Sequence, residues 1–321
     1  RTDEKIEDPS IVRKIANFCN VRPDCVIENT TLPILYEAPL MLEEAHLSDI
    51  VCRELQIEAP APDMTQWREM VDRIRHPQGT VRIAMVGKYM QLHDAYLSVT
   101  EALRHAAYAL GRSVHIDYVD SETINEGNMA EMLGEADGIL VPGGFGERGI
   151  EGMIAAARYA RETAKPYLGI CLGMQVAVIE FARHVVGWAD ANSHEFNPNG
   201  THSVVDFMPD QNDEIDKGGT LRLGAYPCMV QPGTTLARCY GAEQISERHR
   251  HRYEFNNLYR DEIRNAGLTL CGVSPDGRLV EAVELSEQPF FVGVQYHPEF
   301  KSRPTHPHPL FLGLISASMK K

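Results

Sequence analysis

The sequence lacks several features that would assign it to a specialised class of protein. Its seven cysteines are an odd number and show no C-x-x-C spacing, which argues against a disulfide framework or a zinc ribbon. No run of about 18 apolar residues occurs, so no helix is expected to cross a membrane. The first residues are too polar for a secretory signal. These absences predict a cytoplasmic globular protein with reduced thiols.

Cationic charge is also scarce. The chain has 31 Lys and Arg against 45 Asp and Glu, a formal net charge of −14. Nucleic acid and anionic membrane surfaces both need cationic partners, so neither is expected. The basic run from Arg248 to Arg252 is flanked by Glu247 and Glu254, which weakens it as a nucleic-acid patch. The chain opens without Met in a charged stretch, which favours the later part of a longer protein.

The apolar pattern changes near residue 80, and we predict a domain boundary there. The 321 residues suit about two domains. Before the boundary, residues 9–18 and 41–55 have apolar side chains at helical spacing. Residues 60–79 are bounded by prolines and glycine and hold one short amphipathic helix, which indicates a linker.

After residue 80, strands and helices alternate. Apolar runs that predict strands lie at 81–87, 114–119, 137–144 and 166–170, and helical patterns lie at 94–110, 150–163 and 173–185. This alternation predicts an α/β domain with a mostly parallel central sheet flanked by helices. Shorter strands are expected at 203–207, 227–231, 268–273, 279–284 and 290–295, with a last helix at 309–318. We expect this later part to be smaller and antiparallel or mixed.

The sharpest local motif is Gly169-Ile170-Cys171-Leu172-Gly173. It has the form G-x-nucleophile-x-G between a predicted strand and a predicted helix, the context of a nucleophile elbow. Glycines flank the nucleophile because the tight turn leaves no room for Cβ atoms. A thiol at a helix N-terminus also gains stability as the thiolate. A plain strand–helix turn with an incidental buried cysteine is the alternative.

A general base for this thiol follows the last predicted strand. His297 stands in QYHPEF, and Glu299 lies two residues further on, within reach of the imidazole. Strand ends are where open α/β sheets present catalytic groups. The three residue types fit a Cys–His–acid triad. The chain order, with only one residue between the histidine and the acid, is unusual.

A glycine-rich loop, VPGGFG, follows the strand at 137–144. Its backbone N–H groups could hold an oxyanion, with Gly144 and Leu172 as the expected pair of donors. The run from Gly144 to Gly149 also matches the dinucleotide pattern G-x-G-x-x-G. We reject that interpretation because the acidic residue expected about twenty positions later, Glu162, falls in a predicted helix.

PGGFG, GICLGMQ and QYHPEF, in this order, resemble the class I (triad) glutamine amidotransferases. AMVGKYMQLHDAYLSVTEAL, GGTLRLGA and ERHRHRYEFNN further resemble the CTP synthase family, and the resemblance spans the whole chain. It implies a class I amidotransferase fold over 80–321, a 60–79 linker, and a 1–59 helical remnant of a synthetase domain.

The resemblance also implies roles for individual residues. Cys171 would attack the glutamine amide, His297 would shuttle the proton and Glu299 would orient His297. Residues implied in glutamine binding or the oxyanion hole are Gly144, Leu172, Gly173, Met174, Gln175, Glu195 and Arg252. An acid and a cation suit the α-ammonium and α-carboxylate of a zwitterionic substrate.

Further implications concern nucleotides and partners. Lys14 matches a nucleotide-contacting lysine, and Thr220 and Arg222 match an effector lid that responds to GTP. Glutamine hydrolysis would need no cofactor and no metal in this chain. Amination of UTP to CTP would need ATP and Mg²⁺, bound mainly by a missing N-terminal domain, since no G-x-x-x-x-G-K-[ST] loop occurs here. A homotetramer, and filaments, are also implied.

Two other functions stay open from the sequence alone. A sister amidotransferase would share the three core motifs and feed ammonia to a different acceptor. A regulatory or scaffold domain would be expected to lack a triad member, whereas all three candidates are present.

Overall fold

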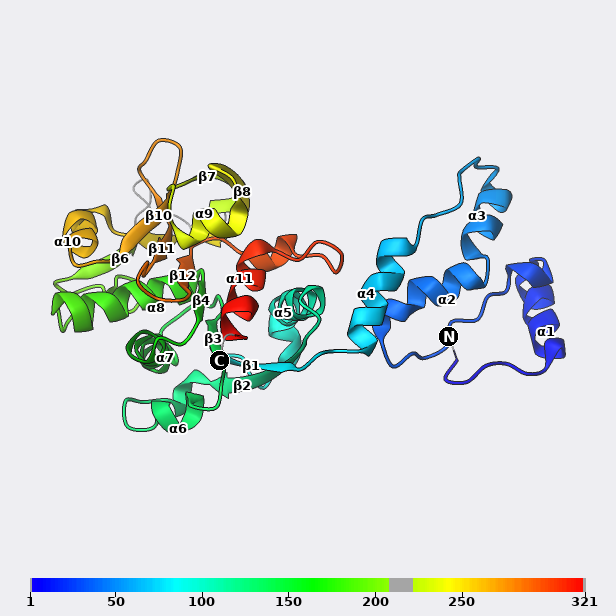
Figure 1. Cartoon of the computed structure of the whole chain (residues 1–321), viewed down its shortest axis with the longest axis horizontal. Coiled ribbons are helices and arrows are strands. Elements are labelled where there is room, and N and C mark those ends of the chain that lie inside the picture. The colour runs from blue at the N-terminus through cyan, green and yellow to red at the C-terminus, as the bar shows by residue number, and fades with distance from the viewer. Residues whose placement is uncertain (1, 208–221, 320–321) are drawn as a thin grey trace. The chain divides into compact units, whose positions relative to one another are not determined.

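The computed structural model describes residues 2–207 and 222–319. The chain forms two compact units, Arg1–Pro77 and Gln78–Lys321 (Figure 1). Within the described residues, no helix has both the length and the apolar character needed to cross a membrane.

The first unit is helical and has a small apolar core. Its helices are α1 (Pro9–Cys19), α2 (Ala38–Glu44), α3 (Leu47–Leu55) and α4 (Thr65–Arg75). Helix α4 lies in the segment interpreted as a linker, yet it packs within this unit: the Trp67 indole donates to the Tyr36 carbonyl at 2.7 Å. The division into 1–59, 60–79 and 80–321 stays a prediction.

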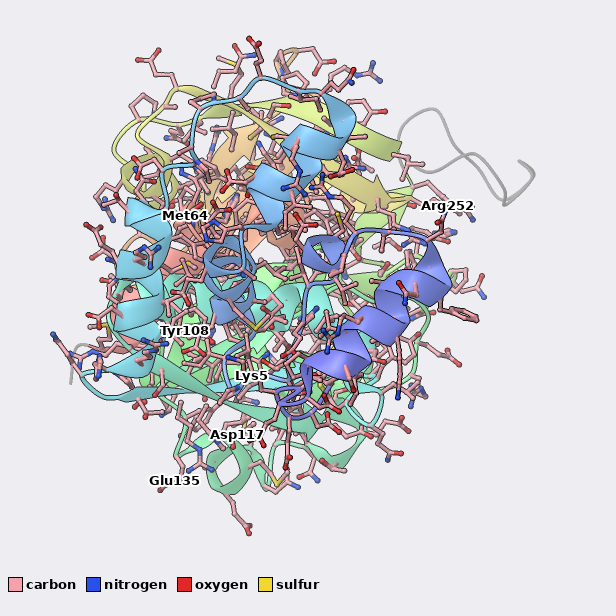
Figure 2. The ribbon with its side chains drawn as sticks, turned by 90° about the vertical axis from the view of Figure 1, so that its right-hand side faces the viewer. Lys5, Met64, Tyr108, Asp117, Glu135 and Arg252 are labelled. Carbon is pink, nitrogen blue, oxygen red and sulfur yellow. The ribbon has the colours of Figure 1, made fainter. Side chains whose placement is uncertain are left out.

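A nine-stranded sheet in the described residues organises the second unit. Its order is β2-β1-β3-β4-β12-β11-β10-β7-β8. The first five strands run parallel: β2 (Ser113–Asp120), β1 (Thr80–Gly87), β3 (Gly138–Val141), β4 (Tyr167–Ile170) and β12 (Phe291–Val294). The last three of these are buried along their whole length, as expected for a sheet covered on both faces. At the edge, Asp117 on β2 (labelled in Figure 2) accepts a hydrogen bond from Arg82 at 2.6 Å.

The remaining strands of the large sheet are antiparallel. They are β11 (Val280–Glu284), β10 (Thr269–Val273), β7 (Arg222–Val230) and β8 (Gln244–His251). A second, three-stranded sheet combines β5 (Asn192–Ser193), β6 (Ser203–Phe207) and β9 (Tyr253–Phe255). The mixed character predicted for the later part of the chain is therefore confirmed.

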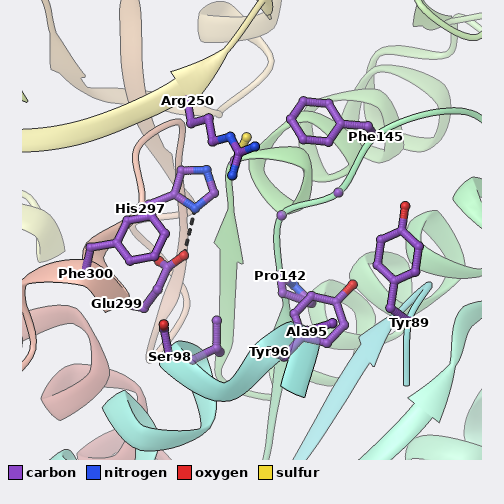
Figure 3. Close-up of a pocket in the computed structure, with 14 residues that line it drawn as sticks. Tyr89, Ala95, Tyr96, Ser98, Pro142, Phe145, Arg250, His297, Glu299 and Phe300 are labelled. Atoms are coloured by element: carbon purple, nitrogen blue, oxygen red, sulfur yellow. Dashed lines mark hydrogen bonds and ion pairs between the residues drawn. The ribbon is translucent and has the colours of Figure 1, made fainter. Parts of the chain in front are cut away.

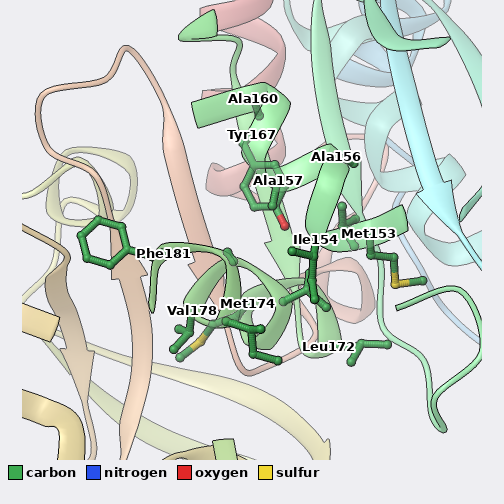
Figure 4. Packing of buried hydrophobic residues seen from close by; sticks show 14 of the residues in the cluster. Met153, Ile154, Ala156, Ala157, Ala160, Tyr167, Leu172, Met174, Val178 and Phe181 are labelled. Atoms are coloured by element: carbon green, nitrogen blue, oxygen red, sulfur yellow. The ribbon is translucent and has the colours of Figure 1, made fainter. Parts of the chain in front are cut away.

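Helices cover both faces of the large sheet. One face carries α7 (Ile150–Thr163) and α8 (Leu172–Phe181), and the other carries α5 (Leu97–Ala109), α9 (Thr235–Tyr240) and α11 (Pro309–Ser318). The shorter α6 (Met129–Leu133) and α10 (Arg260–Asn265) complete the unit. Every residue of α8 is buried, because the helix lies between the sheet, α7 and the small sheet (Figure 4). The turn that precedes α8 is therefore held firmly in place.

A buried ion pair joins α7 to α8. The Arg161 guanidinium donates to both carboxylate oxygens of Glu180, at 2.8 to 3.1 Å, and the Glu180 side chain is 0% exposed. We expect Arg161→Met to lower the free energy of unfolding by about 3 kcal/mol, because it leaves a buried carboxylate without its main partner. Urea unfolding measures this loss.

Arg158→Met is the matched control, because Arg158 pairs with the exposed Glu126 and Glu162. Exposed pairs contribute about 0 to 1 kcal/mol. Equal losses in the two variants would contradict the role given to the buried pair.

Candidate active site

Cys171 occupies a sharp turn between β4 and α8. Its backbone φ of 53° and ψ of −102° lie in a region that favours glycine, so this residue is strained. A Cβ at Gly169 would lie 2.5 Å from the Gly173 carbonyl oxygen, and one at Gly173 would overlap the Val141 carbonyl. The turn therefore requires both glycines, and it holds the thiol at the N-terminus of α8.

His297 and Glu299 follow β12, the strand that pairs in parallel with β4. Val294 lies opposite Ile170, and the Cys171 N–H donates to the Val294 carbonyl at 2.7 Å. His297 Nδ1 contacts Glu299 Oε1 at 2.7 Å, and both side chains are largely buried. Because Glu299 occupies Nδ1, Nε2 is the ring nitrogen left to act on Cys171.

The electrostatics of His297 favour its charged form. Burial by itself lowers the pKa of His297, but the Cys171 sulfur and the Glu299 carboxylate together outweigh it and raise the pKa to about 10. An imidazolium beside a thiolate and a carboxylate is the charge arrangement expected of an activated cysteine nucleophile.

The glycine-rich loop after β3 closes over this pair. A Cβ at Gly143 would lie 2.9 Å from His297 Cε1 and 3.5 Å from Cys171 Cβ, and one at Gly144 would lie 3.2 Å from Leu172 Cδ2. Leu172 opens α8, where backbone N–H groups have no intrahelical acceptor. Gly144 therefore lies against the Leu172 side chain, and it lines the same cavity as Cys171. That the two N–H groups form an oxyanion hole stays a prediction.

A cavity of about 290 Å³ opens on Cys171, His297 and Glu299 (Figure 3). Its other walls come from the glycine-rich loop, from Arg250 and Phe300, and from the segment that leads into α5, where Tyr89 and Tyr96 lie. The volume suits a small molecule.

The three residues expected to bind a zwitterionic substrate lie close together. Glu195 accepts a hydrogen bond from the Gly146 N–H at 2.9 Å. Burial raises the pKa of Glu195, and the positive charges of Lys88 and Arg252 oppose that rise. Gln175 is buried and its Nε2 donates to the carbonyl of Tyr253, the residue after Arg252 (labelled in Figure 2). Gly173 and Met174 complete this first turn of α8, where Met174 is buried against Gly293.

Lys88 is a site residue that the sequence analysis did not single out. It is 3% exposed, and its Nζ donates to the Phe145 carbonyl at 3.0 Å and to the Gly146 carbonyl. Burial lowers the pKa of Lys88 to about 8. Lys88 therefore fixes the glycine-rich loop, together with Glu195. Its position directly after β1 was the available signal.

Three further candidates came from the sequence, Lys14, Thr220 and Arg222. Lys14 is exposed on α1 in the first unit. Thr220 lies outside the described residues. Arg222 pairs with the buried Glu281 at 2.6 Å and lies over the Tyr226 ring at 4.5 Å, so its guanidinium already has internal partners. Its role at an effector lid stays a prediction.

Glu254 and His251 are buried titratable side chains beside the site. Burial raises the pKa of Glu254 to about 8, while it holds the pKa of His251 well below the ordinary value. The folded carboxyl of Glu254 therefore binds its proton more tightly than the unfolded one, whose pKa is 4.5. Glu254 therefore contributes stability that is lost as pH rises from about 4.5 to about 8.

We expect Glu254→Gln to remove this dependence, because the amide does not titrate. The stability advantage of the variant over the wild type should grow steadily between about pH 5 and about pH 8. Urea midpoints at several pH values measure it, and a constant difference would contradict the assignment.

We also searched the described residues for side chains that could bind a metal ion together. Over residues 2–207 and 222–319, no group of three or more His, Cys, Asp or Glu is arranged to hold a metal ion. The expectation that glutamine hydrolysis needs no metal in this chain stays a prediction.

Comparison with known proteins assigns this chain to a protein class. The family model for glutamine amidotransferase class-I matches residues 91–317, and the chain belongs to this class. The model for the CTP synthase N-terminus matches residues 1–57. A Trypanosoma brucei structure described as the CTPS glutaminase domain with bound acivicin is 45% identical, with a TM-score of 0.71 over 75% of this chain and 94% of that one. The chain is a member of the CTP synthase family.

Curated relatives agree with this assignment. The CTP synthase of Geobacillus kaustophilus is 54% identical over 96% of this chain and 58% of its own length. That of Halalkalibacterium halodurans is 53% identical over the whole chain and 60% of its own length. The chain thus spans somewhat more than half of these relatives. The predicted α/β amidotransferase fold is confirmed.

Proposed function

We propose that this chain hydrolyses glutamine to glutamate and ammonia through a thioester on Cys171. The observation that carries the proposal is the strained Cys171 turn beside the His297–Glu299 pair. The cysteine thiolate attacks the side-chain carbonyl carbon, and the carbonyl oxygen takes up the negative charge. The N–H groups of Gly144 and Leu172 stabilise that oxyanion.

Collapse of this intermediate breaks the C–N bond. The His297 imidazolium gives its proton to the departing nitrogen, which leaves as ammonia, and the carbonyl re-forms as a thioester. His297 then takes a proton from water, which attacks the thioester and releases glutamate and the thiolate. Glu299 keeps the imidazole oriented throughout. Glu195 and Arg252 hold the α-ammonium and α-carboxylate of the substrate, with Gln175, Gly173 and Met174 beside them.

For the whole protein we propose the CTP synthase reaction, a carbon–nitrogen ligation in pyrimidine biosynthesis. Ammonia from this site would aminate UTP, with ATP and Mg²⁺ bound mainly by an N-terminal domain outside these 321 residues. Lys14 would contact a nucleotide, and Thr220 and Arg222 would take part in the response to GTP. Assembly as a homotetramer and a cytoplasmic location belong to the same proposal. The relatives named CTP synthase support the proposed ligation reaction.

The direct test uses acivicin, the compound bound in the Trypanosoma relative, as an electrophilic glutamine analogue. We expect a single adduct on the peptide that contains Cys171, and loss of glutamate release to the same extent. Labelling of a different cysteine, with glutamine hydrolysis unchanged, would refute the proposed nucleophile. A purely regulatory or scaffold domain would release no glutamate before labelling.

A further inference from the structure

Gln295 lies directly against the candidate nucleophile. It follows β12, whose parallel pairing with β4 brings residue 295 level with residue 171. Its backbone N–H donates to the Glu281 carbonyl at 2.8 Å, and the residue is 0% exposed. The Gln295 Nε2 atom lies 3.6 Å from Cys171 Sγ. The side chain therefore meets the sulfur from the same strand end that supplies His297.

A second glutamine holds Gln295 in this position. Gln175 Nε2 donates to Gln295 Oε1 at 3.2 Å and to the Tyr253 carbonyl oxygen at 2.8 Å. Both glutamine side chains are buried. The contacts form one series that runs from the Tyr253 carbonyl through Gln175 and Gln295 to the sulfur.

The direction of every hydrogen bond in this series follows from its first member. A backbone carbonyl can only accept, so the Gln175 NH₂ group must face Tyr253. The same NH₂ group also faces Gln295, which must present its carbonyl oxygen in return. The Gln295 NH₂ group is then left to face Cys171 Sγ, and an N–H aimed at sulfur favours the thiolate over the thiol.

We propose that the Gln295 carboxamide is a catalytic residue that donates a hydrogen bond to the Cys171 thiolate, and that Gln175 is the positioning residue that orients it. This inference rests on the proposed role of Cys171 as the nucleophile. An amide N–H cannot transfer its proton at neutral pH, so it stabilises the sulfur anion without quenching it. The His297 proton thereby stays available for the departing ammonia.

The fraction of Cys171 that is present as reactive thiolate should depend on this hydrogen bond. Hydrogen bonds to charged groups are strong enough that losing one changes such a population about tenfold. As the C–S bond forms, charge leaves the sulfur and the interaction weakens. The hydrogen bond therefore affects the amount and orientation of the thiolate more than the stability of the oxyanion.

The experiment measures alkylation of Cys171 by iodoacetamide as a function of pH in the 321-residue chain, with quantification of the Cys171 peptide by mass spectrometry. Gln295→Glu keeps the shape and replaces the donor by an acceptor, and Gln295→Met removes the donor without adding charge. We expect the alkylation midpoint to rise by about one pH unit in Gln295→Met and by more in Gln295→Glu. Gln175→Leu should shift it in the same direction by less.

Gln244→Glu is the control, because Gln244 is exposed at the start of β8. It should leave the midpoint unchanged. An unchanged or lowered midpoint in folded Gln295→Met, verified by circular dichroism, would overturn the proposal, whatever Gln295→Glu does. Alkylation does not depend on glutamine turnover. If the chain released no glutamate but showed the shift, the proposed hydrogen bond to sulfur would stand and the glutaminase proposal would be refuted.

Discussion

Replacing Cys171 by alanine should reduce glutamine hydrolysis by at least about 10⁴-fold, the scale on which removal of a covalent nucleophile acts. The variant retains the backbone turn and loses only the atom that forms the thioester. Glutamate release by the purified chain, measured against an enzyme-free blank, gives the residual rate. Retention of a hundredth or more of the wild-type rate would exclude the thioester route.

Cys239→Ala is the appropriate control for this variant. Cys239 is half-buried on the opposite face of the sheet from α8, and burial raises the pKa of its thiol to about 11. It therefore stays protonated under assay conditions, and its removal should leave the rate within about twofold of the wild type. Binding of glutamine to Cys171→Ala should persist, because Glu195 and Arg252 are untouched.

The second large effect is expected at His297, and its comparison with Glu299 tests the division of roles. His297→Ala should cost about as much as loss of the nucleophile, since His297 is the proposed proton carrier both for thiolate formation and for the departure of ammonia. Glu299→Gln should cost about tenfold to hundredfold less, because the acid acts only through the imidazole. Glutamate release by both variants, measured across a range of pH, settles the order.

Glu299→Gln should also change the pH dependence of the rate of glutamine hydrolysis. Glu299 is one of the groups that raise the pKa of His297 to about 10. The neutral amide should therefore lower the pKa of His297 and move the alkaline limb of the rate profile to lower pH. A larger loss in Glu299→Gln than in His297→Ala would reverse the assigned roles.

The elements around the candidate nucleophile could be predicted because their signals are local. Strand β4, the glycines of the turn and the apolar helix that follows are all encoded within residues 166–185. The same holds for β12 and the residues after it. Cys171 and His297 could be associated because each follows directly after a predicted strand. The parallel pairing of β12 with β4 was not predicted, since residues 290–295 were expected in the antiparallel or mixed part.

Other elements carry no local signal of this kind. Strand β8 consists almost entirely of polar and charged residues, and its inward positions are Glu247, His249 and His251, so hydrophobic periodicity did not reveal it. The apolar pattern over 41–55 is interrupted by His46 at a φ of 58°, which separates α2 from α3. A residue with a left-handed backbone conformation does not change the spacing of apolar residues, so the break between the two helices could not be predicted.

Contacts between side chains far apart in the sequence were also not predicted, even where one partner, Glu195 or Gln175, had been named as a site residue. Lys88 and Glu195 meet at the Phe145–Gly146 loop from distant parts of the chain. The contact of Gln295 with Gln175 spans 120 positions. Such contacts depend on how strands and helices from distant parts of the chain pack together. A lysine or glutamine beside a strand also has many ordinary explanations.

The positive φ of Cys171 sets stability and activity against each other at a single residue. Glycine would adopt this backbone conformation without penalty, whereas any side chain there costs about 1 to 3 kcal/mol. The strained backbone at residue 171 is thus the structural cost of placing a thiol at the start of α8.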